Sequence, residues 1–403
     1  MSWEYVKLGD LYSVHNGLSK GGKFFGSGYP FLTFSTVFNN YFIPDELTDL
    51  VQSTEKEQNN YSVKRGDVFV TRTSETSDEL GMSCVALKDY PHATYNGFTK
   101  RMRPLQDGRV LPEYIGYYMR MPSFRGEFQA FSTMTTRASL KNEDLLGLKV
   151  ALPPIEIQEK IANTLKVYDD LIKNNQKQIK LLEEAAQRLY KEWFVDLRFP
   201  GHEDIAIVDG VPDGWIEDTI DSKIDLLSGY AFKSAEFNDE GTYKIVTIKN
   251  VKDGQFDGDN VSRMVDIPPK MPEHCKLSDG DILLSLTGNV GRVCIVHGDN
   301  YLLNQRVAKI KSDNPTYAYC LFRSKVMFDE MNNLANGAAQ QNLSPIRTGK
   351  IKVVFPTDEL IDTFEEIVSP MIEKNTMLNK TMLLLSQARD RLLPKLMSGE
   401  IEV

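Results

Sequence analysis

Several features that are typical of other protein classes are scarce or missing in this chain of 403 residues. Its four cysteines are widely spaced and form no CxxC or CxxH pair, so the sequence indicates neither a zinc site nor a disulfide framework. No apolar run approaches the roughly 18 residues of a membrane span. The N-terminal residues also lack the basic and apolar regions of a signal peptide. We therefore predict a cytoplasmic protein that does not enter a membrane.

Signals of catalysis are missing as well. The five histidines show no ligand spacing, and no Ser/His/Asp group is recognisable. Residues 24–28 match the F-x-G-x-G pattern of S-adenosylmethionine-dependent methyltransferases, but no Asn-Pro-Pro-Tyr/Phe tetrapeptide occurs, so we expect a flexible loop there. Pro212 and Asp213, followed by Asp221 and Lys223, have the spacing of a nuclease site, which arises often by chance. The sequence thus predicts no catalytic, cofactor or metal site in the chain itself.

Positive charge is not in excess, because the net charge is −9. This value at first argues against nucleic acid as a partner. Most of the negative charge, however, lies in residues 151–210 and 356–403, so the remaining segments are close to neutral and could still carry a basic face. Charge neutralisation supplies much of the affinity for DNA, and a near-neutral DNA-binding chain would therefore need partner subunits.

The chain does contain an internal repeat. Residues 138–154 align with residues 341–357 at an offset of 203. The same offset continues into two runs of seam positions spaced alternately by four and three, the pattern of a coiled coil. The positions of the first run are Ile161, Leu165, Tyr168, Ile172, Asn175, Ile179, Leu182, Ala186, Leu189 and Trp193. Those of the second are Phe364, Val368, Met371, Asn375, Leu378, Met382, Leu385, Arg389, Leu392 and Leu396.

The two runs predict two long helices. Each helix could pack on its own globular unit, but the unbroken alternation favours a pair of helices, each with a seam about 48 Å long. We expect an antiparallel pair, because each globular unit precedes its helix and the linker then starts the second unit beside the end of the first helix. In this pair Asn175 would face Asn375 in a buried polar layer, and Ala186 would face Phe364.

The second helix carries its own boundary signals. Thr357 precedes two acidic residues and is expected to cap the helix. Pro394 should end it, since proline has no N–H to continue the hydrogen-bond ladder. Pro370 lies inside the run and should kink the helix or remove one bond.

Each globular unit combines short β-rich segments, turns and helical stretches without regular βαβ alternation, which predicts an α+β fold. Residues 67–73 correspond to 281–287, each after a glycine turn, and residues 97–102 correspond to 304–309. A helical stretch follows in each unit, at residues 112–120 and 316–328.

Two sets of loops are rich in side chains that read base edges or bind phosphate. They lie at equivalent places in both units and differ in their side chains, which favours recognition of two different sequences over solvated turns. The candidate DNA-contacting residues are Arg72, Thr73, Ser74, Lys100, Thr135, Thr136, Arg137, Thr287, Asn289, Arg292, Arg306, Gln340, Gln341 and Asn342. Arg101, Arg103, Lys309 and Lys311 are further candidates for phosphate contacts, although strand alternation would turn some of them away.

On these grounds the chain resembles the specificity subunits of type I restriction–modification enzymes. The resemblance is carried by residues 152–161, with two prolines followed by the heptad helix, by the opening Pro212-Asp213-Gly214-Trp215, and by the duplicated layout of unit and helix. It extends over essentially the whole chain. The second copy departs from it at Phe355-Pro356-Thr357, which has a single proline.

The resemblance implies a non-catalytic subunit with two target recognition domains, which each read half of a bipartite, asymmetric site in double-stranded DNA. The helices would separate the domains and bind two methyltransferase subunits, which carry S-adenosylmethionine, and motor–nuclease subunits can join the complex. The predicted parts are a first recognition domain (1–153), a first helix (154–196), a linker (197–214), a second recognition domain (215–356), and a second helix with a C-terminal tail (357–403).

Two other interpretations stay open at this point. The units could bind other proteins, so that the chain would be an adaptor with a coiled-coil spine and no DNA binding. The chain could also be a self-contained methyltransferase, which the missing tetrapeptide disfavours. Salt-dependent binding to duplex DNA would separate a DNA-recognition subunit from an adaptor.

Overall fold

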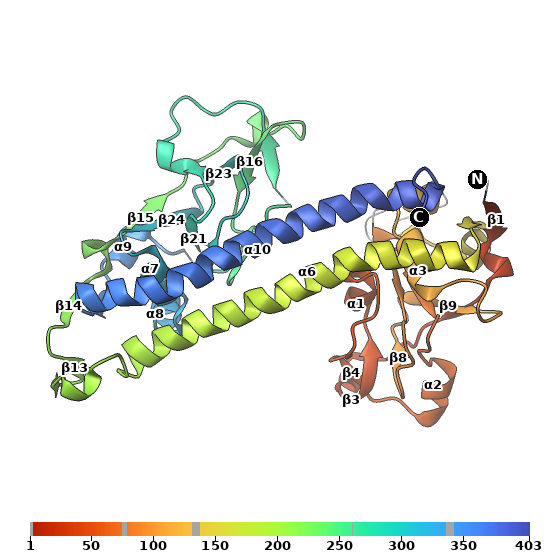
Figure 1. Ribbon diagram of the computed structural model, residues 1–403, viewed down its shortest axis with the longest axis horizontal. Helices are drawn as coiled ribbons and strands as arrows, with labels where there is room; N and C mark the ends of the chain where they lie inside the picture. Colours follow the sequence, from red (N-terminus) through yellow and green to blue (C-terminus); the bar gives the residue numbers. More distant parts are fainter. Residues whose placement is uncertain (1–2, 75–78, 131–137, 260, 336–341) are drawn as a thin grey trace. The chain divides into compact units, whose positions relative to one another are not determined.

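Contacts within the molecule divide the chain into two units, and each unit combines one mixed domain with parts of two long helices (Figure 1). Unit 1 comprises Met1–Asp170 and Ser386–Val403, and unit 2 comprises Leu171–Leu385. The structure is a computed structural model, and it describes residues 3–74, 79–130, 138–259, 261–335 and 342–403. The predicted α+β class is confirmed in both units.

A four-stranded antiparallel sheet, in the order β2-β9-β5-β7, forms the centre of the domain in unit 1. Strand β5 is rich in β-branched and aromatic residues and is buried along its whole length, as expected for a strand covered on both faces. A second sheet has the order β4-β3-β8, β1 pairs with β11, and β6 with β10. The strands are β1 (Glu4–Lys7), β2 (Tyr12–Asn16), β3 (Phe25–Leu32), β4 (Leu50–Val51), β5 (Val68–Thr71), β6 (Thr73–Ser74), β7 (Ser83–Val85), β8 (Thr94–Tyr95), β9 (Thr99–Pro104), β10 (Ala138–Ser139) and β11 (Lys149–Leu152).

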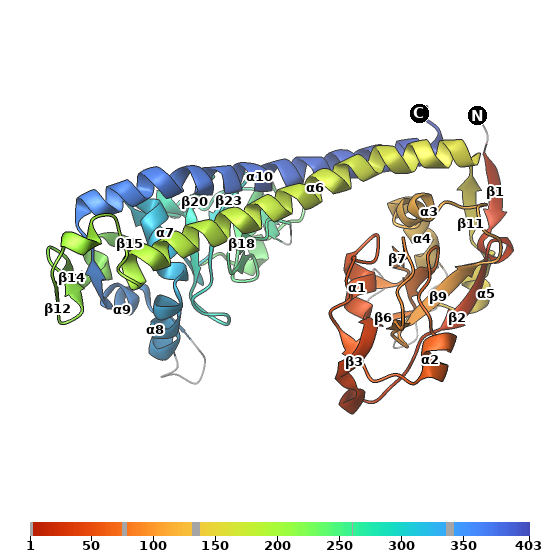
Figure 2. The same ribbon diagram turned by 60° about the horizontal axis from the view of Figure 1, so that its bottom comes forward.

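Helices α3 and α4 of unit 1 lie next to the first part of the long helix α6 (Figure 2). Tyr114 and Ile115 of α3 are buried in one core with Ile161 and Leu165 of α6. The apolar seam of α6 is therefore covered by its own domain as well as by a partner helix. The helices of this part of the chain are α1 (Phe34–Asn39), α2 (Glu55–Asn60), α3 (Pro112–Tyr118), α4 (Pro122–Ala130), α5 (Asn142–Gly147) and α6 (Ile155–Tyr190), which continues as a π-helical turn (Lys191–Val195).

Unit 2 repeats this topology. Its central sheet has the order β15-β24-β21-β22, and β14 pairs with β25 as β1 pairs with β11. The strands are β14 (Ile216–Thr219), β15 (Ile224–Ser228), β16 (Tyr243–Val246), β17 (Val251–Lys252), β18 (Gln255–Phe256), β19 (Ser262–Met264), β20 (Lys276–Leu277), β21 (Ile282–Ser285), β22 (Val293–Ile295), β23 (Tyr301–Leu303), β24 (Val307–Ser312) and β25 (Lys352–Phe355). The helices are α7 (Pro315–Arg323), α8 (Lys325–Ala335), α9 (Pro345–Gly349) and the long helix α10 (Asp358–Ser398). A short hairpin of β12 (Ile207–Val208) and β13 (Val211–Pro212) precedes the domain.

The two long helices run antiparallel within each unit, as the sequence predicts. In unit 1, Lys160 at the start of α6 donates to the carbonyl of Val403 beyond the end of α10 (3.1 Å). In unit 2, Trp193 after the end of α6 packs edge-to-face against Phe364 at the start of α10, with ring centroids 5.9 Å apart. No helix among the described residues has the length and apolar character that a membrane span requires.

A carboxylate on α6 ties the domain of unit 1 to the helix pair. The Asp169 carboxylate accepts a hydrogen bond from the Tyr117 hydroxyl of α3 (2.6 Å) and pairs with the Arg389 guanidinium of α10 (2.6 Å). Burial raises the pKa of Tyr117, so its hydroxyl stays protonated as the donor. Arg389, a seam position in the sequence pattern, thus has a polar partner across the helix pair.

Unit 2 has its own polar layer, centred on Glu183 of α6. The Glu183 carboxylate accepts from the Tyr319 hydroxyl (2.7 Å) and the Asn375 side-chain amide (2.9 Å), and it pairs with Arg323 of α7. Burial lowers the pKa of Arg323 to about 10, which still leaves the guanidinium charged near neutral pH. The predicted pairing of Asn175 with Asn375 is therefore wrong. Asn375 instead contacts Glu183, which lies one heptad and one residue after Asn175 on α6.

Two further local predictions are also wrong. Pro394 does not end α10, which continues to Ser398 because the surrounding Leu393, Leu396 and Met397 are buried in the core of unit 1. The segment expected as a flexible loop enters strand β3 at Phe25. The Thr357 cap is confirmed, since its hydroxyl accepts from the backbone N–H of Leu360 (3.4 Å).

Candidate nucleic-acid interface

Three segments of unit 1 meet at one end of the central sheet. The loop after β5 begins with Arg72, whose backbone N–H donates to the carbonyl of Phe98 (3.0 Å) and whose carbonyl accepts from the N–H of Leu140 (2.9 Å). Directly beyond Arg72, β6 pairs with β10, so that Thr73 lies opposite Ser139. The first predicted loop is thus adjacent to the strand that follows the second predicted loop.

Unit 2 repeats these bonds with different residues. The backbone N–H of Leu286 donates to the carbonyl of Arg306 (3.0 Å), and its carbonyl accepts from the N–H of Leu343 (2.7 Å). Leu286 therefore takes the place of Arg72, and Arg306 takes the place of Phe98.

The loop after the central strand is closed in the same way in both units. The hydroxyl of Thr71 accepts a hydrogen bond from the backbone N–H of Met82 (2.9 Å), and that of Ser285 accepts from Arg292 (3.0 Å). The enclosed loop is longer in unit 1, where it spans residues 71–82, than in unit 2, where it spans residues 285–292. The shared closure shows that the two loops are variations on one backbone frame.

The turns that precede β9 and β24 also correspond. The side-chain oxygen of Asn96 accepts from the backbone N–H of Phe98 (2.7 Å), and that of Asn304 accepts from the backbone N–H of Arg306 (3.3 Å). We call residues 96–99 and 304–307 the tip turns. The correspondence differs by one residue from the alignment of the sequence segments, which places Asn304 beside Gly97.

A glycine directly after the neighbouring strand, β2 in unit 1 and β15 in unit 2, allows each tip turn to approach that strand end closely. A Cβ atom on Gly17 would lie 2.0 Å from the carbonyl oxygen of Asn96, and one on Gly229 would lie 2.3 Å from that of Asn304. Neither distance is compatible with a side chain. Both tip turns are therefore fixed by their neighbours as well as by their own hydrogen bonds.

In unit 1 these segments enclose a basic cleft of about 680 Å³. The Lys100 ammonium donates to the side-chain oxygen of Asn142, and burial and the charge of Arg72 lower the pKa of Lys100. The buried Nε of Arg72 has no hydrogen-bond partner among the described residues. Two neighbouring cations, one with an unused donor, form a site suited to an anion such as a phosphate group. The cleft is lined by Asn16, Arg72, Lys100, Leu140, Lys141, Asn142 and Glu143.

At the corresponding place in unit 2, the described residues provide no such pair of cations. Leu286 and Ala308, the counterparts of Arg72 and Lys100, are both buried and apolar. Polar and charged side chains lie at the edge instead, where Asn289, Arg306 and Asn342 are exposed. The two units therefore present the same backbone with different chemistry.

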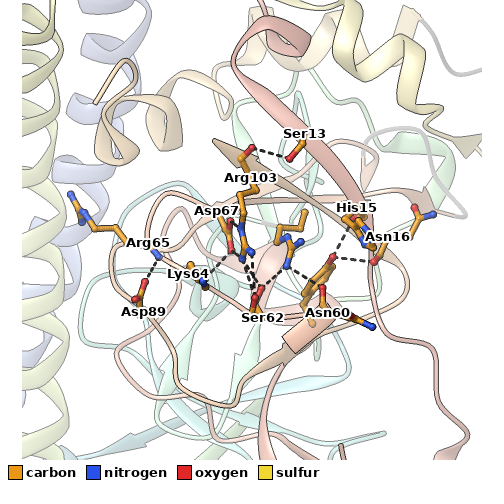
Figure 3. A network of polar contacts seen from close by, with 12 residues as sticks. Ser13, His15, Asn16, Asn60, Ser62, Lys64, Arg65, Asp67, Asp89 and Arg103 are labelled. Atoms are coloured by element: carbon orange, nitrogen blue, oxygen red, sulfur yellow. Dashed lines mark hydrogen bonds and ion pairs between the residues drawn. The ribbon is translucent and has the colours of Figure 1, made fainter. Parts of the chain in front are cut away.

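Three of the weaker phosphate candidates have structural roles and face other partners. Arg103 pairs with the fully buried Asp67 (2.6 Å) beside Ser62 (Figure 3). Arg101 donates to the carbonyl of Ser62 (2.8 Å). In unit 2, Lys309 pairs with Asp281 (2.7 Å). By strand alternation Arg101 and Arg103 lie on the face of β9 opposite to Lys100. The phosphate contacts of these three residues stay predictions, and all three side chains already have protein partners.

Nine of the fourteen predicted contact residues lie in these segments or beside them. They are Arg72, Thr73, Ser74, Lys100, Thr287, Asn289, Arg292, Arg306 and Asn342. Arg292 is half-buried. Burial raises the pKa of Asp253, and the nearby positive charge of Arg292 partly opposes this increase. The remaining five, Thr135, Thr136, Arg137, Gln340 and Gln341, lie outside the described residues.

Sequence reasoning missed four residues that the structure adds to this region: Asn16, Phe98, Lys141 and Asn142. Phe98 could have been found from Asn96 and Asn304, which begin the two tip turns and fix the correct correspondence with Arg306. The other three become neighbours only through sheet pairing and through the start of α5, for which the sequence offers no short-range signal.

Comparisons with known proteins agree on one family. The family described as type I restriction modification DNA specificity domain matches residues 1–184 and 212–381. The MjaIX type I restriction enzyme specificity subunit of Methanocaldococcus jannaschii is 25% identical over 419 residues, which cover 100% of this chain and 94% of that protein. The HindI specificity subunit of Haemophilus influenzae is 23% identical over 475 residues, with 99% of both chains covered. The crystal structure of a type I restriction–modification S subunit from M. genitalium has the same fold, with a TM-score of 0.57, 16% identity, and coverage of 98% of this chain and 96% of that one.

Proposed function

This chain belongs to the family of type I restriction–modification DNA specificity domains, and from this premise we propose that it recognises a bipartite, asymmetric DNA sequence, one half with each domain. It would do so without a catalytic site of its own. The two domains would contact DNA through the tip turns and the loops beside them. The family is named for DNA specificity. Because the same backbone arrangement occurs once in each domain, a DNA site with two separate halves would be expected.

The observation that carries this proposal is the equivalent backbone frame with unequal side chains. Hydrogen bonds between corresponding positions hold Arg72 in unit 1 and Leu286 in unit 2. Residues that only stabilised the frame would be expected to be alike in both units. Instead the exposed positions differ in charge and shape, which is what the recognition of two different half-sites requires.

We further infer that the chain works in the cytoplasm with two methyltransferase subunits, which would bind S-adenosylmethionine, and that motor–nuclease subunits can join them. The charge balance supports the need for partners, because a chain with a net charge of −9 gains little affinity for DNA from long-range attraction. Partner subunits with basic surfaces would supply the missing phosphate contacts. The relatives named above are specificity subunits of restriction enzymes, in agreement with this role.

Methylation mapping of the assembled enzyme tests the proposal. The chain is co-expressed with its methyltransferase subunits, and the modified positions in a DNA library define the site. We expect two short blocks of fixed sequence separated by unread bases. Thr287 and Asn289 replaced together by alanine should relax recognition in one block only, with each lost base contact costing about 1–3 kcal/mol. A continuous site, or equal loss in both blocks, would contradict the proposal.

The chain without its partners serves as the control for catalysis. Incubated with DNA and S-adenosylmethionine, it should leave the DNA unmodified. Methyl transfer by the pure chain would contradict the non-catalytic role.

A further inference from the structure

The two tip turns differ in a way that suggests what each domain reads. Phe98 is 57% exposed although it is held on a turn closed by the Asn96 side chain. Its carbonyl accepts from the backbone N–H of Arg72, a residue that lines the basic cleft, so the tip turn that carries the ring is adjacent to the cleft. A lone exposed aromatic residue needs no explanation, but an aromatic ring next to clustered cations is typical of a nucleic-acid contact.

Arg306 occupies the same position on the other tip turn. Its side chain is exposed and forms no ion pair among the described residues, whereas Lys309 on the same strand is paired with Asp281. Leu286 and Ala308 lie behind it and offer no competing charge. The guanidinium of Arg306 is therefore available for a ligand.

We propose that Phe98 and Arg306 are equivalent specificity-determining residues that read opposite types of base pair. Phe98 contacts the 5-methyl group of a thymine in the half-site of unit 1. Arg306 donates two hydrogen bonds to the O6 and N7 atoms of a guanine in the half-site of unit 2. These are the contacts that an apolar side chain and an arginine make in the major groove. The inference rests on the function proposed above and assigns base types to one position of each half-site.

The surroundings of each residue support this division. In unit 1, phosphate binding can be left to Arg72 and Lys100, so the tip needs no charge of its own. In unit 2 the places of these two cations are apolar, and the exposed positive charge has moved to the tip itself. A guanine edge offers two acceptors to a planar guanidinium, which a thymine or cytosine edge does not.

The test uses the complete methyltransferase complex and duplexes that carry its mapped site. In one series each thymine of the unit 1 half-site is replaced in turn by uracil, which lacks only the methyl group. In a second series each guanine of the unit 2 half-site is replaced by 7-deazaguanine, which lacks the N7 acceptor. We expect one uracil position to lower the methylation rate about tenfold with the wild-type chain and to have no effect with Phe98→Ala.

For unit 2, one 7-deazaguanine position should lower the rate about tenfold with the wild-type chain and have no effect with Arg306→Ala. Replacing guanine by 7-deazaguanine should lower the logarithm of the methylation rate less than half as much with Arg306→Lys as with the wild-type chain, since an ammonium cannot form the bidentate contact. If Arg306 contacted a phosphate, its loss would weaken binding to all sequences alike and reduce the salt dependence. That result would overturn the assignment of guanine.

Matched controls lie on the same domains. Leu105, which follows β9, is a 59% exposed apolar residue away from the tip, and Lys352 has a 68% exposed side chain paired with Glu217. Leu105→Ala and Lys352→Ala should methylate all modified duplexes as the wild-type chain does. The inference would be overturned if Phe98→Ala lost methylation rate at the same uracil position as the wild-type chain does. A mapped half-site of unit 1 without thymine would also overturn it. Failure of the proposed function would look different, since the wild-type complex would then have no bipartite site at all.

Discussion

The tip turns and the loops beside them have the same backbone hydrogen bonds in both domains but carry different exposed side chains. Residues that build the frame are alike: Gly17 and Gly229 allow the close approach, while Asn96 and Asn304 close the tip turns. Exposed positions on the tip turns are unlike, as Phe98 and Arg306 show. The comparison teaches that the frame tolerates large changes at its exposed positions, because none of its hydrogen bonds depends on those side chains.

The buried carboxylate at the turn before the central strand should produce the largest difference between the two domains. Asp67 is fully buried against Arg103, whereas the side chain of its counterpart Asp281 is 16% exposed against Lys309. We expect Asp67→Ala to lower the free energy of unfolding by about 3–5 kcal/mol, because the fully buried carboxylate accepts two hydrogen bonds from Arg103 and one from the backbone N–H of Lys64, and all of these donors lose their acceptor. Asp281→Ala should cost less than about 2 kcal/mol, since this carboxylate is partly exposed and forms a single ion-pair contact with Lys309.

Urea denaturation of the full chain measures both variants. Asp67→Asn is the control, because its amide can still accept the hydrogen bond from the backbone N–H of Lys64 that the carboxylate accepts now (2.8 Å). It should recover part of the loss. Equal losses for the two alanine variants would show that burial does not distinguish the two turns.

A smaller loss of stability is expected when a side chain is added at the glycines that let the tip turns approach the neighbouring strand ends, Gly17 and Gly229. Gly17→Ala should destabilise the fold by about 1–3 kcal/mol, because its Cβ would overlap the carbonyl oxygen of Asn96 and the tip turn must shift. Methylation mapping should show lost recognition in the half-site of unit 1 and an unchanged half-site of unit 2. Gly147→Ala is the control, since a Cβ there meets no atom within 4 Å. If Gly17→Ala left the specificity intact, the tip turn would not belong to the recognition frame.

The basic cleft allows a test of binding that leaves stability nearly unchanged. Arg72→Met and Lys100→Met should each lower the slope of log affinity against log salt concentration by about one, because each removes one phosphate contact. The reduction should apply equally to all DNA sequences. Lys352→Met, outside the cleft, should leave the slope unchanged in the same titrations of the assembled complex. A loss confined to one half-site would mean that these cations read bases.

Much of this architecture could be predicted from the sequence because it depends on local patterns. Alternation by three and four predicts both long helices, and the repeat of residues 138–154 predicts that Leu140 and Leu343 have equivalent roles, which their hydrogen bonds to Arg72 and Leu286 confirm. Features that depend on distant partners were not predictable. A heptad pattern fits several registers, and the actual one places Asn375 against Glu183, which also pairs with Arg323 of the domain.

The candidate site shows the same division. Polar loop composition indicates Thr73 and Thr287, but it says nothing about Phe98, since an aromatic residue in a β-rich segment usually indicates a core position. Only the turn closed by Asn96 turns this ring outward. Likewise, strand alternation alone left open which of the basic residues of β9 face the cleft, and the buried Asp67 decides this by pairing with Arg103.

The smallest effect on stability, and the sharpest contrast between folding and function, is expected at Thr287. Its hydroxyl oxygen is buried and has no hydrogen-bond partner among the described residues, and its backbone forms a bridge with Asn342. A buried hydroxyl without a partner costs free energy, so Thr287→Val, which has nearly the same shape, should leave the unfolding free energy unchanged or raise it by about 0.5–1 kcal/mol. If the hydroxyl is kept for DNA, the same variant should relax recognition at one base pair of the unit 2 half-site. Thermal unfolding of the full chain and methylation mapping of the complex measure the two effects separately. A variant that is clearly destabilised, or that methylates the original site with undiminished specificity, would show that Thr287 belongs to the frame that both domains share and not to the surface that distinguishes them.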